Sequence, residues 1–434
     1  MARIISILTA LATLVSHVLF GVSGIPPVQR ARSEDRLPSV FVGGLFGYGE
    51  QTPLWHSMPY PGILGNLQNL ITAEGFEFYT ASTGPFSSTW DRAVNLFAEL
   101  TGTRVDYGVA HAREHGHARF GRTYERPLVP DWSPERPIHL FGYSLGAQTV
   151  RLFAHLLAEG CPRERAATPP EELSPLFAGG NESLIHSITS LAGTFNGSTI
   201  EVAFLEGQST LMHTVIFQPF LLMGRFGRLN AIYDLQLDHF GLSGVGGDTR
   251  WNLVRTSDVR DFFNSRDHTM FCLSPGGAAA LNQIVTTRPD IYHFSYALCI
   301  TTYDEATGHW VVNREELTAM PLFYLFGNRM GRGEGRFYGR SYEYPGGRFT
   351  VDETWWRNDG STNVISALYP FGAPNQAFDP DNIRRGTWQV MPVMHGYNHG
   401  FFGGFDFKHD IEVLVDFFLD HFAILEQTWP PAAN

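Results

Sequence analysis

The pentapeptide Gly-Tyr-Ser-Leu-Gly at residues 142–146 constrains the fold of this chain more than any other segment. The apolar residues 137–141 precede it, and residues 147–159, which have the composition of a helix, follow it. A G-x-S-x-G sequence between a strand and a helix forms a strained turn that raises the serine hydroxyl above the sheet. The outer glycines let the helix pack closely against the strand. The pattern predicts that Ser144 is the nucleophile of a hydrolase, and an ordinary glycine-rich turn is the alternative.

The amino-acid composition and net charge exclude some classes of function for this chain. The chain has 434 residues, of which 43% are apolar and 14% aromatic, which is ample for a large buried core. Its 43 acidic residues outnumber 31 basic ones and give a net charge of −12. Because binding of nucleic acid depends on clustered Lys and Arg against phosphates, we exclude a nucleic-acid partner and expect a neutral substrate.

The N-terminal segment has the pattern of a secretory signal peptide. Arg3 precedes an apolar stretch at residues 4–22, and the small residues Ser23 and Gly24 follow it. We predict a signal peptide over residues 1–24 and hence a secreted, extracellular protein. A membrane anchor is the alternative, but the stretch contains polar residues and is short for a span. The polar residues 25–37 are predicted to form a tail or a short pro-segment.

Beyond residue 38, segments typical of strands alternate with segments typical of helices. Such alternation favours a mostly parallel sheet covered by helices on both faces. We therefore predict an α/β-hydrolase fold in a single domain over residues 38–434. The predicted strands cover residues 39–42, 76–79, 138–141, 185–192 and 292–300, and the predicted helices cover 64–73, 90–100, 147–159 and 410–427.

Cys161, Cys272 and Cys299 are too few for a disulfide-stapled scaffold. A bridge between Cys272 and Cys299, a bridge that includes Cys161, and three free thiols are all compatible with the sequence. No catalytic role is assigned to the cysteines.

Two residues downstream of Ser144 have the order expected for its partners. On an α/β-hydrolase fold the acid follows the serine and the histidine comes last. Asp359 and His399 satisfy this order, and both lie in glycine-bearing loops. His399 would accept the proton of Ser144, and Asp359 would orient the imidazole. His395 is a nearby competitor that composition alone does not eliminate.

The oxyanion of an ester intermediate needs two converging backbone N–H donors. Leu145, the residue after the nucleophile, would supply one of them. The glycine-rich turn at residues 43–47 follows the first predicted strand, and Leu45 within it would supply the other.

Four longer motifs are more specific than the pentapeptide. They are Gly-Pro-Phe-Ser-Ser-Thr-Trp-Asp-Arg-Ala at 84–93, Val-Asp-Tyr-Gly-Val-Ala-His at 105–111, His-Gly-His-Ala-Arg-Phe-Gly-Arg-Thr-Tyr at 115–124, and Trp-Gln-Val-Met-Pro at 388–392. With them, the chain resembles the zinc-containing true lipases of the Bacillus and staphylococcal type from about residue 40 to residue 418.

The resemblance implies a secreted triacylglycerol lipase that hydrolyses long-chain carboxylic esters at an oil–water interface. Ser144, Asp359 and His399 match the triad of that family, which forms an acyl-enzyme. A carboxylesterase or phospholipase that acts on other acyl esters is an alternative. An inert lipid-binding protein on the same fold is a second alternative, because a fold does not guarantee chemistry.

The resemblance also implies a structural zinc ion attached to an insert at about residues 84–125. In the resembling lipases two aspartates and two histidines hold this zinc, and they match Asp91, His111, His117 and Asp267. Four protein ligands leave no open position, so the ion would brace the fold. Without the resemblance, the spacing of these histidines is a poor signal for a metal site, and ordinary exposed histidines explain it better.

Calcium is expected to be absent or weakly bound. Related lipases carry an acidic residue two positions after the catalytic histidine and another a few positions later. Here Phe401 occupies the first position and only Asp406 keeps the second. Losing a charged oxygen ligand weakens a site for a hard cation.

The family places its lid in the region of residues 194–228, which here is strongly apolar. A lid covers the cleft in water and opens on lipid. From composition alone, a buried core helix explains this segment equally well. With the resemblance, we predict a helical lid in this region.

Overall fold

The computed structural model describes residues 36–52, 54–55, 59–61, 66–200, 233–242, 261–262 and 264–429. The predicted signal peptide and the predicted tail lie outside the described residues, except for residues 36 and 37. The same is true of the predicted lid region beyond residue 200. These three assignments stay predictions.

Seven strands form the central sheet, in the order β13-β14-β7-β6-β5-β1-β2. Every pairing within it is parallel, which confirms the predicted sheet type. The strands are β1 (Ser39–Val42), β2 (Phe78–Ala81), β5 (Ile138–Tyr143), β6 (Ile185–Leu191), β7 (Tyr292–Tyr296), β13 (Asn375–Ala377) and β14 (Trp388–Val390).

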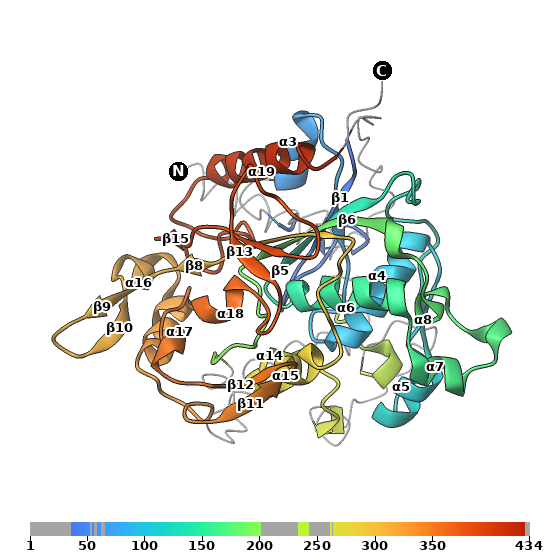
Figure 1. Cartoon of the computed structure of the whole chain (residues 1–434), viewed down its shortest axis with the longest axis horizontal. Coiled ribbons are helices and arrows are strands. Elements are labelled where there is room, and N and C mark those ends of the chain that lie inside the picture. The colour runs from blue at the N-terminus through green and yellow to red at the C-terminus, as the bar shows by residue number, and fades with distance from the viewer. Residues whose placement is uncertain are drawn as a thin grey trace, which may run out of the picture.

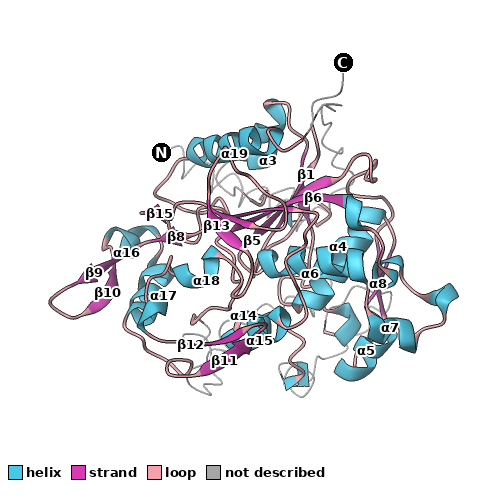
Figure 2. Cartoon of the chain, viewed as in Figure 1, coloured by secondary structure: helices cyan, strands magenta, loops and turns pink. Residues whose placement is uncertain are grey.

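Helices cover both faces of this sheet (Figures 1 and 2). On one face lie α4 (Thr89–Thr101) and α6 (Gly146–Glu159), and on the other lie α3 (Leu67–Ala73) and α19 (Ile411–Glu426). Alternate residues of a strand point to opposite faces. Within β1, Val40 and Val42 accordingly join the apolar core beneath α4 and α6, whereas Phe41 joins the core beneath α3 and α19.

The remaining elements are short. The helices are α5 (Val109–His115), α7 (Pro162–Ala167), α8 (Pro175–Ala178), α14 (Thr269–Leu273), α15 (Pro275–Asn282), α16 (Glu315–Ala319), α17 (Pro321–Gly331) and α18 (Val364–Leu368). The hairpin strands are β3 (Arg104–Asp106) with β4 (Phe120–Thr123), β9 (Thr301–Asp304) with β10 (His309–Val312), and β11 (Ser341–Tyr344) with β12 (Gly347–Thr350).

The strand predicted at residues 292–300 is divided. Its first part is β7, and its second part is β8 (Leu298–Cys299), which pairs with β15 (Met394–His395) outside the central sheet. All three cysteines are free thiols, so neither possible bridge is formed. Among the described helices, none has the length and apolar character needed to cross a membrane.

The strand order places the site. β1 and β5 are neighbours in the sheet. β2, the sheet strand that follows β1 in the sequence, lies on the far side of β1 from β5, and β6, which follows β5, lies on the far side of β5 from β1. At such a reversal of strand order, the loops after the two strands diverge and leave room for a ligand. Gly43 follows β1 and Ser144 follows β5, so the glycine-rich turn and the predicted nucleophile meet there.

A buried histidine of α19, which contacts strands β6 and β7, is expected to make stability depend on pH. His421 is fully buried, and its ring nitrogens form hydrogen bonds with Thr189 Oγ1 at 2.7 Å and Tyr296 Oη at 2.9 Å. Burial lowers the pKa of His421 to about 3, whereas a histidine in an unfolded chain titrates near pH ~6.5. The unfolded state therefore takes up a proton first as the pH falls.

We predict that His421→Gln, which retains hydrogen-bonding groups but cannot titrate, reduces acid destabilisation. Between pH ~7 and ~5, the free energy of unfolding of the wild type should fall by about 2 kcal/mol more than that of the variant. Urea unfolding at the two pH values measures this. His395→Gln, at an exposed position, is the control. A wild-type minus variant difference that is the same at both pH values would contradict the prediction.

Candidate active site

The turn at Ser144 has the geometry of a strained nucleophile elbow. Ser144 has φ of 57°, in the left-handed region. A Cβ on Gly146 would lie 2.0 Å from the carbonyl oxygen of Val42, and a Cβ on Gly142 would lie 2.7 Å from Cα of Ala147. Both outer glycines are therefore required by close backbone packing, and the local prediction from the pentapeptide agrees with the structure.

The structure brings the three predicted triad residues together. The hydroxyl of Ser144 lies 3.0 Å from Nε2 of His399, and Nδ1 of His399 lies 2.8 Å from Oδ2 of Asp359. Because Nδ1–H donates to the carboxylate, Nε2 is the nitrogen left to accept the serine proton. All three residues are buried, with Ser144 6% exposed. The competitor His395 lies in β15 with its side chain exposed.

The carboxylate of Asp359 is held by its own loop. Its Oδ1 accepts hydrogen bonds from the backbone N–H groups of Ser361 at 2.9 Å and Thr362 at 2.6 Å. The backbone N–H of His399 donates to the carbonyl of Asp359 at 2.9 Å, and Tyr143 Oη donates to the carbonyl of His399 at 2.8 Å. The acid and histidine loops are thus bound to each other and to the end of β5.

The two residues predicted to supply oxyanion donors, Leu45 and Leu145, lie in segments that adjoin Ser144. Leu145 is the N-cap residue of α6, where backbone N–H groups precede the hydrogen-bonded part of the helix. A Cβ on Gly44 would lie 2.6 Å from Cβ of Ser144, so the turn that carries Leu45 runs directly against Ser144. An oxyanion hole requires two converging N–H groups, and the donor roles of Leu45 and Leu145 stay predictions.

Arg92, which the sequence analysis did not identify, forms hydrogen bonds with the turn at residues 43–47. It is fully buried, and its guanidinium donates to the carbonyls of Gly43, Gly84 (2.6 Å) and Gly44 (3.5 Å) and to Thr149 Oγ1 (3.1 Å). Burial lowers the pKa of Arg92 to about 10, so the side chain keeps its charge at neutral pH. Its place directly after Asp91 in the motif at residues 84–93 was the available signal.

The four predicted metal ligands form a second cluster beside the first turn of α4. One ligand atom from each of Asp91, His111, His117 and Asp267 lies within 4.8 Å of the others. His111 Nε2 lies 3.3 Å from Asp91 Oδ1 and 3.1 Å from Asp267 Oδ2, and His117 Nε2 lies 3.2 Å from the same Asp267 oxygen. The cluster therefore gathers two carboxylates and two imidazoles that could hold a metal ion.

Unsatisfied atoms in this cluster fit a bound cation. Nδ1 of His117 donates to the carbonyl of Ala118 at 2.9 Å, so in the neutral ring the lone pair of Nε2 faces the buried carboxylate of Asp267. Among the described residues, neither this Nε2 nor Asp91 Oδ1 has a hydrogen-bond partner. Burial lowers the pKa of His111. The hydrogen bonds and charges of Asp267 and Asp91 together have the larger effect and raise this pKa to about 9.

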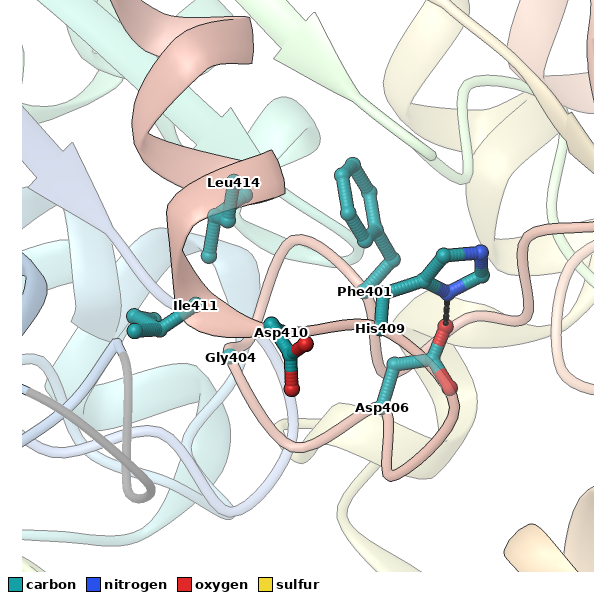
Figure 3. A pocket seen from close by; sticks show the side chains of 7 residues that line it. All are labelled: Phe401, Gly404, Asp406, His409, Asp410, Ile411 and Leu414. Carbon is teal, nitrogen blue, oxygen red and sulfur yellow. Dashed lines mark hydrogen bonds and ion pairs between the residues drawn. The ribbon is translucent and has the colours of Figure 1, made fainter.

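The loop behind His399 forms a small pocket against the start of α19 (Figure 3). Asp406, the acidic residue kept from the pattern of related lipases, is engaged by protein groups. Its Oδ1 accepts from Asn398 Nδ2 at 2.9 Å and from the backbone N–H of Lys408 at 3.0 Å, and its Oδ2 pairs with His409 Nδ1 at 2.6 Å. The expectation of absent or weak calcium stays a prediction.

Comparison with known proteins agrees with the fold and the motifs. Residues 35–427 match the family described as lipase-like, C-terminal domain. The chain is 31% identical over 379 residues to lipase 2 of Staphylococcus aureus, covering 86% of this chain and 51% of that protein. It is 31% identical over 388 residues to a lipase of Staphylococcus hyicus, covering 88% and 56% respectively. The chain thus spans about half the length of the curated relatives it matches.

Solved structures show the same relationship. The crystal structure of Staphylococcus hyicus lipase superposes with a TM-score of 0.75 at 28% identity, covering 93% of this chain and 98% of that chain. EstA from Clostridium botulinum has a TM-score of 0.75 at 31% identity, covering 96% and 93%. With its matched length, parallel sheet and nucleophile elbow, this chain belongs to the family of staphylococcal-type lipases with the α/β-hydrolase fold.

Proposed function

We propose that this protein is a serine hydrolase of carboxylic esters, with Ser144, His399 and Asp359 as its catalytic triad. The observation that carries the proposal is the continuous pair of contacts from Ser144 Oγ to His399 Nε2, 3.0 Å, and from His399 Nδ1 to Asp359 Oδ2, 2.8 Å. Nucleophile, base and orienting group within hydrogen-bond distance are the signature of covalent ester hydrolysis.

The first half of the reaction forms the acyl-enzyme. Ser144 Oγ attacks the ester carbonyl while His399 Nε2 takes the hydroxyl proton, and the carbonyl oxygen becomes an oxyanion. The N–H groups of Leu45 and Leu145 stabilise that charge. The proton on His399 then passes to the leaving alcohol as the ester C–O bond breaks. Asp359 stabilises the transient imidazolium without taking the proton.

The second half restores the enzyme. Water enters after the alcohol leaves, and His399 Nε2 takes its proton as the water oxygen attacks the acyl carbon. The oxyanion forms again at the same two N–H groups. When it collapses, His399 returns the proton to Ser144 Oγ and the fatty acid is released. One histidine thus serves as base and acid in each half-reaction.

We further propose that the substrates are long-chain acyl esters, with triacylglycerol as the main class. Apolar surface beside the triad supports this. The ring of Phe323 in α17 is perpendicular to the ring of His399, with 6.1 Å between the ring centroids. Its helix neighbours Leu322 and Leu325 are 58% and 54% exposed. An exposed group of large apolar side chains is typical of a surface that meets lipid. Hydrolysis at an oil–water interface by a secreted enzyme fits the predicted signal peptide over residues 1–24.

The metal cluster is proposed to hold one structural zinc ion through Asp91, His111, His117 and Asp267. Bound zinc supplies charge neutralisation for two buried carboxylates and a crosslink between the insert and residue 267. The four ligands leave no open position, so the ion would stabilise the fold and take no part in the chemistry.

We predict that Ser144→Ala lowers the rate of ester hydrolysis by at least about 10⁴-fold, because the nucleophile is lost. Asp359→Asn should cost about 10⁴-fold through the wrong histidine tautomer. Steady-state hydrolysis of a chromogenic ester and labelling by a covalent serine probe measure both effects. His395→Gln is the matched control and should retain activity. Full hydrolysis by Ser144→Ala would overturn the triad, and an unlabelled wild type would favour an inert lipid-binding protein.

Chain-length preference separates a lipase from its nearest alternatives. We predict that long-chain triacylglycerol emulsions are hydrolysed and that the rate rises when substrate exceeds its solubility, because the apolar surface then meets an interface. Titration of released fatty acid across chain lengths measures this. Activity confined to soluble short esters would instead indicate a carboxylesterase, and preference for phospholipid vesicles would indicate a phospholipase.

We predict about one zinc ion per chain, and loss of that ion in Asp267→Asn. At free zinc about 1,000 times the dissociation constant, binding stabilises the folded chain by about 4 kcal/mol, so the variant and the chelated wild type should both melt earlier. Metal analysis and calorimetry measure these effects. Asp416→Asn, at an exposed position on α19, is the control. A variant that keeps stoichiometric zinc and its melting temperature would refute this ligand set.

A further inference from the structure

A third histidine touches the metal cluster and is not among its four predicted ligands. His239 lies in the single helical turn Asp238–Phe240, and its side chain is completely buried. Its Nε2 lies 2.9 Å from Oδ2 of Asp91. The motifs at residues 84–93 and 115–124 gave no sign of this contact, because His239 is distant from both in the sequence.

The ring of His239 is held on several sides. It stacks on Tyr107, with 4.1 Å between ring centroids and 26° between ring planes. Tyr107 Oη in turn donates to Oδ1 of Asn95 at 3.1 Å. The ring of His117 meets His239 edge-on at 4.9 Å, and the backbone N–H of Ala118 donates to the carbonyl of His239 at 3.0 Å. Backbone and ring are both fixed, so the direction of Nε2–H is fixed as well.

The two oxygens of Asp91 have different surroundings. Oδ1 lies 3.3 Å from His111 Nε2 and, within the described part of the chain, has no hydrogen-bond partner. Oδ2 accepts the hydrogen bond from His239. One oxygen is therefore available to a metal ion, while the other is occupied. A hydrogen bond to the second oxygen prevents rotation of the carboxylate and keeps the first oxygen aimed at the cluster.

We propose that His239 is a positioning residue of the metal centre, which orients Asp91 for metal binding without being a ligand itself. The proposal rests on the zinc site proposed above. Groups that hydrogen-bond to metal ligands typically contribute a factor of about 10–100 to metal affinity. The metal centre then consists of four ligands and of His239, which fixes the carboxylate of the ligand Asp91.

Two substitutions separate the hydrogen bond from the packing of the ring. His239→Phe keeps a ring on Tyr107 but removes the donor, and His239→Gln restores a donor without the ring. We expect His239→Phe to raise the zinc dissociation constant about 10–100-fold and His239→Gln to recover most of that loss. Competition with a chromophoric chelator gives the dissociation constants. His115→Gln is the control, because His115 lies near the cluster but bonds to the carbonyl of Ser265.

Cobalt(II) provides a readout that a purely structural role would not move. Its absorption bands report ligand geometry, and we expect them to shift in His239→Phe at unchanged coordination number. Zinc affinity of His239→Phe within about threefold of wild type would overturn the proposal while leaving the zinc site intact. A change from five to four ligands would also overturn it, because His239 would then be a ligand. A wild type that binds no zinc would refute the site and this proposal together.

Discussion

The close approach of α6 to the end of β1 is the constraint on which the site depends. The first turn of α6 packs so tightly that a Cβ on Gly146 would lie 2.0 Å from the carbonyl oxygen of Val42. Ser144, two residues earlier, is thereby fixed against the turn that follows β1, where Gly44 in turn leaves no room for a side chain. Ser144, the proposed nucleophile, and the turn that carries one of the proposed oxyanion donors are thus placed relative to each other by backbone contact, before any side-chain partner is considered.

The first turn of α4 connects two sites that are chemically unrelated. Arg92 places a buried positive charge against the carbonyls of the turn after β1, and Asp91, its neighbour, contributes a buried carboxylate to the metal cluster. A buried charge is tolerated only where partners satisfy it. Arg92 is satisfied by carbonyl oxygens and a hydroxyl. Asp91 accepts a hydrogen bond from His239 at Oδ2, and the proposed zinc ion would satisfy Oδ1. The same helical turn therefore supports the proposed oxyanion hole on one side and the proposed zinc site on the other.

Local signals predicted the parts of the molecule that local chemistry determines. The apolar run before residue 142 and the two outer glycines were enough to predict β5, the elbow and α6, because packing there leaves no alternative. Long-range contacts were not predictable in this way. His239 meets Asp91 across 148 positions of sequence, and the strand predicted at residues 292–300 divides because β15, about 100 residues later, pairs with its second half. Chain order indicated Asp359 and His399 as partners of Ser144, but only the resemblance to a known family selected them and the four metal ligands, because family motifs encode such contacts indirectly.

The loop that carries His399 shows how a protein can balance buried acids with its own cations. Glu316 is fully buried and contacts the ammonium group of Lys408, while Asn398, next to His399, donates to Glu316 at 3.0 Å and to Asp406 at 2.9 Å. A metal ion entering here would have to displace these donors and compete with a lysine that is already attached to the loop. The positive charge here belongs to Lys408 of the chain itself. The position of His399, the proposed catalytic histidine, therefore depends on the internal ion pair between Lys408 and Glu316. The free-energy cost of ordering that pair arises during folding.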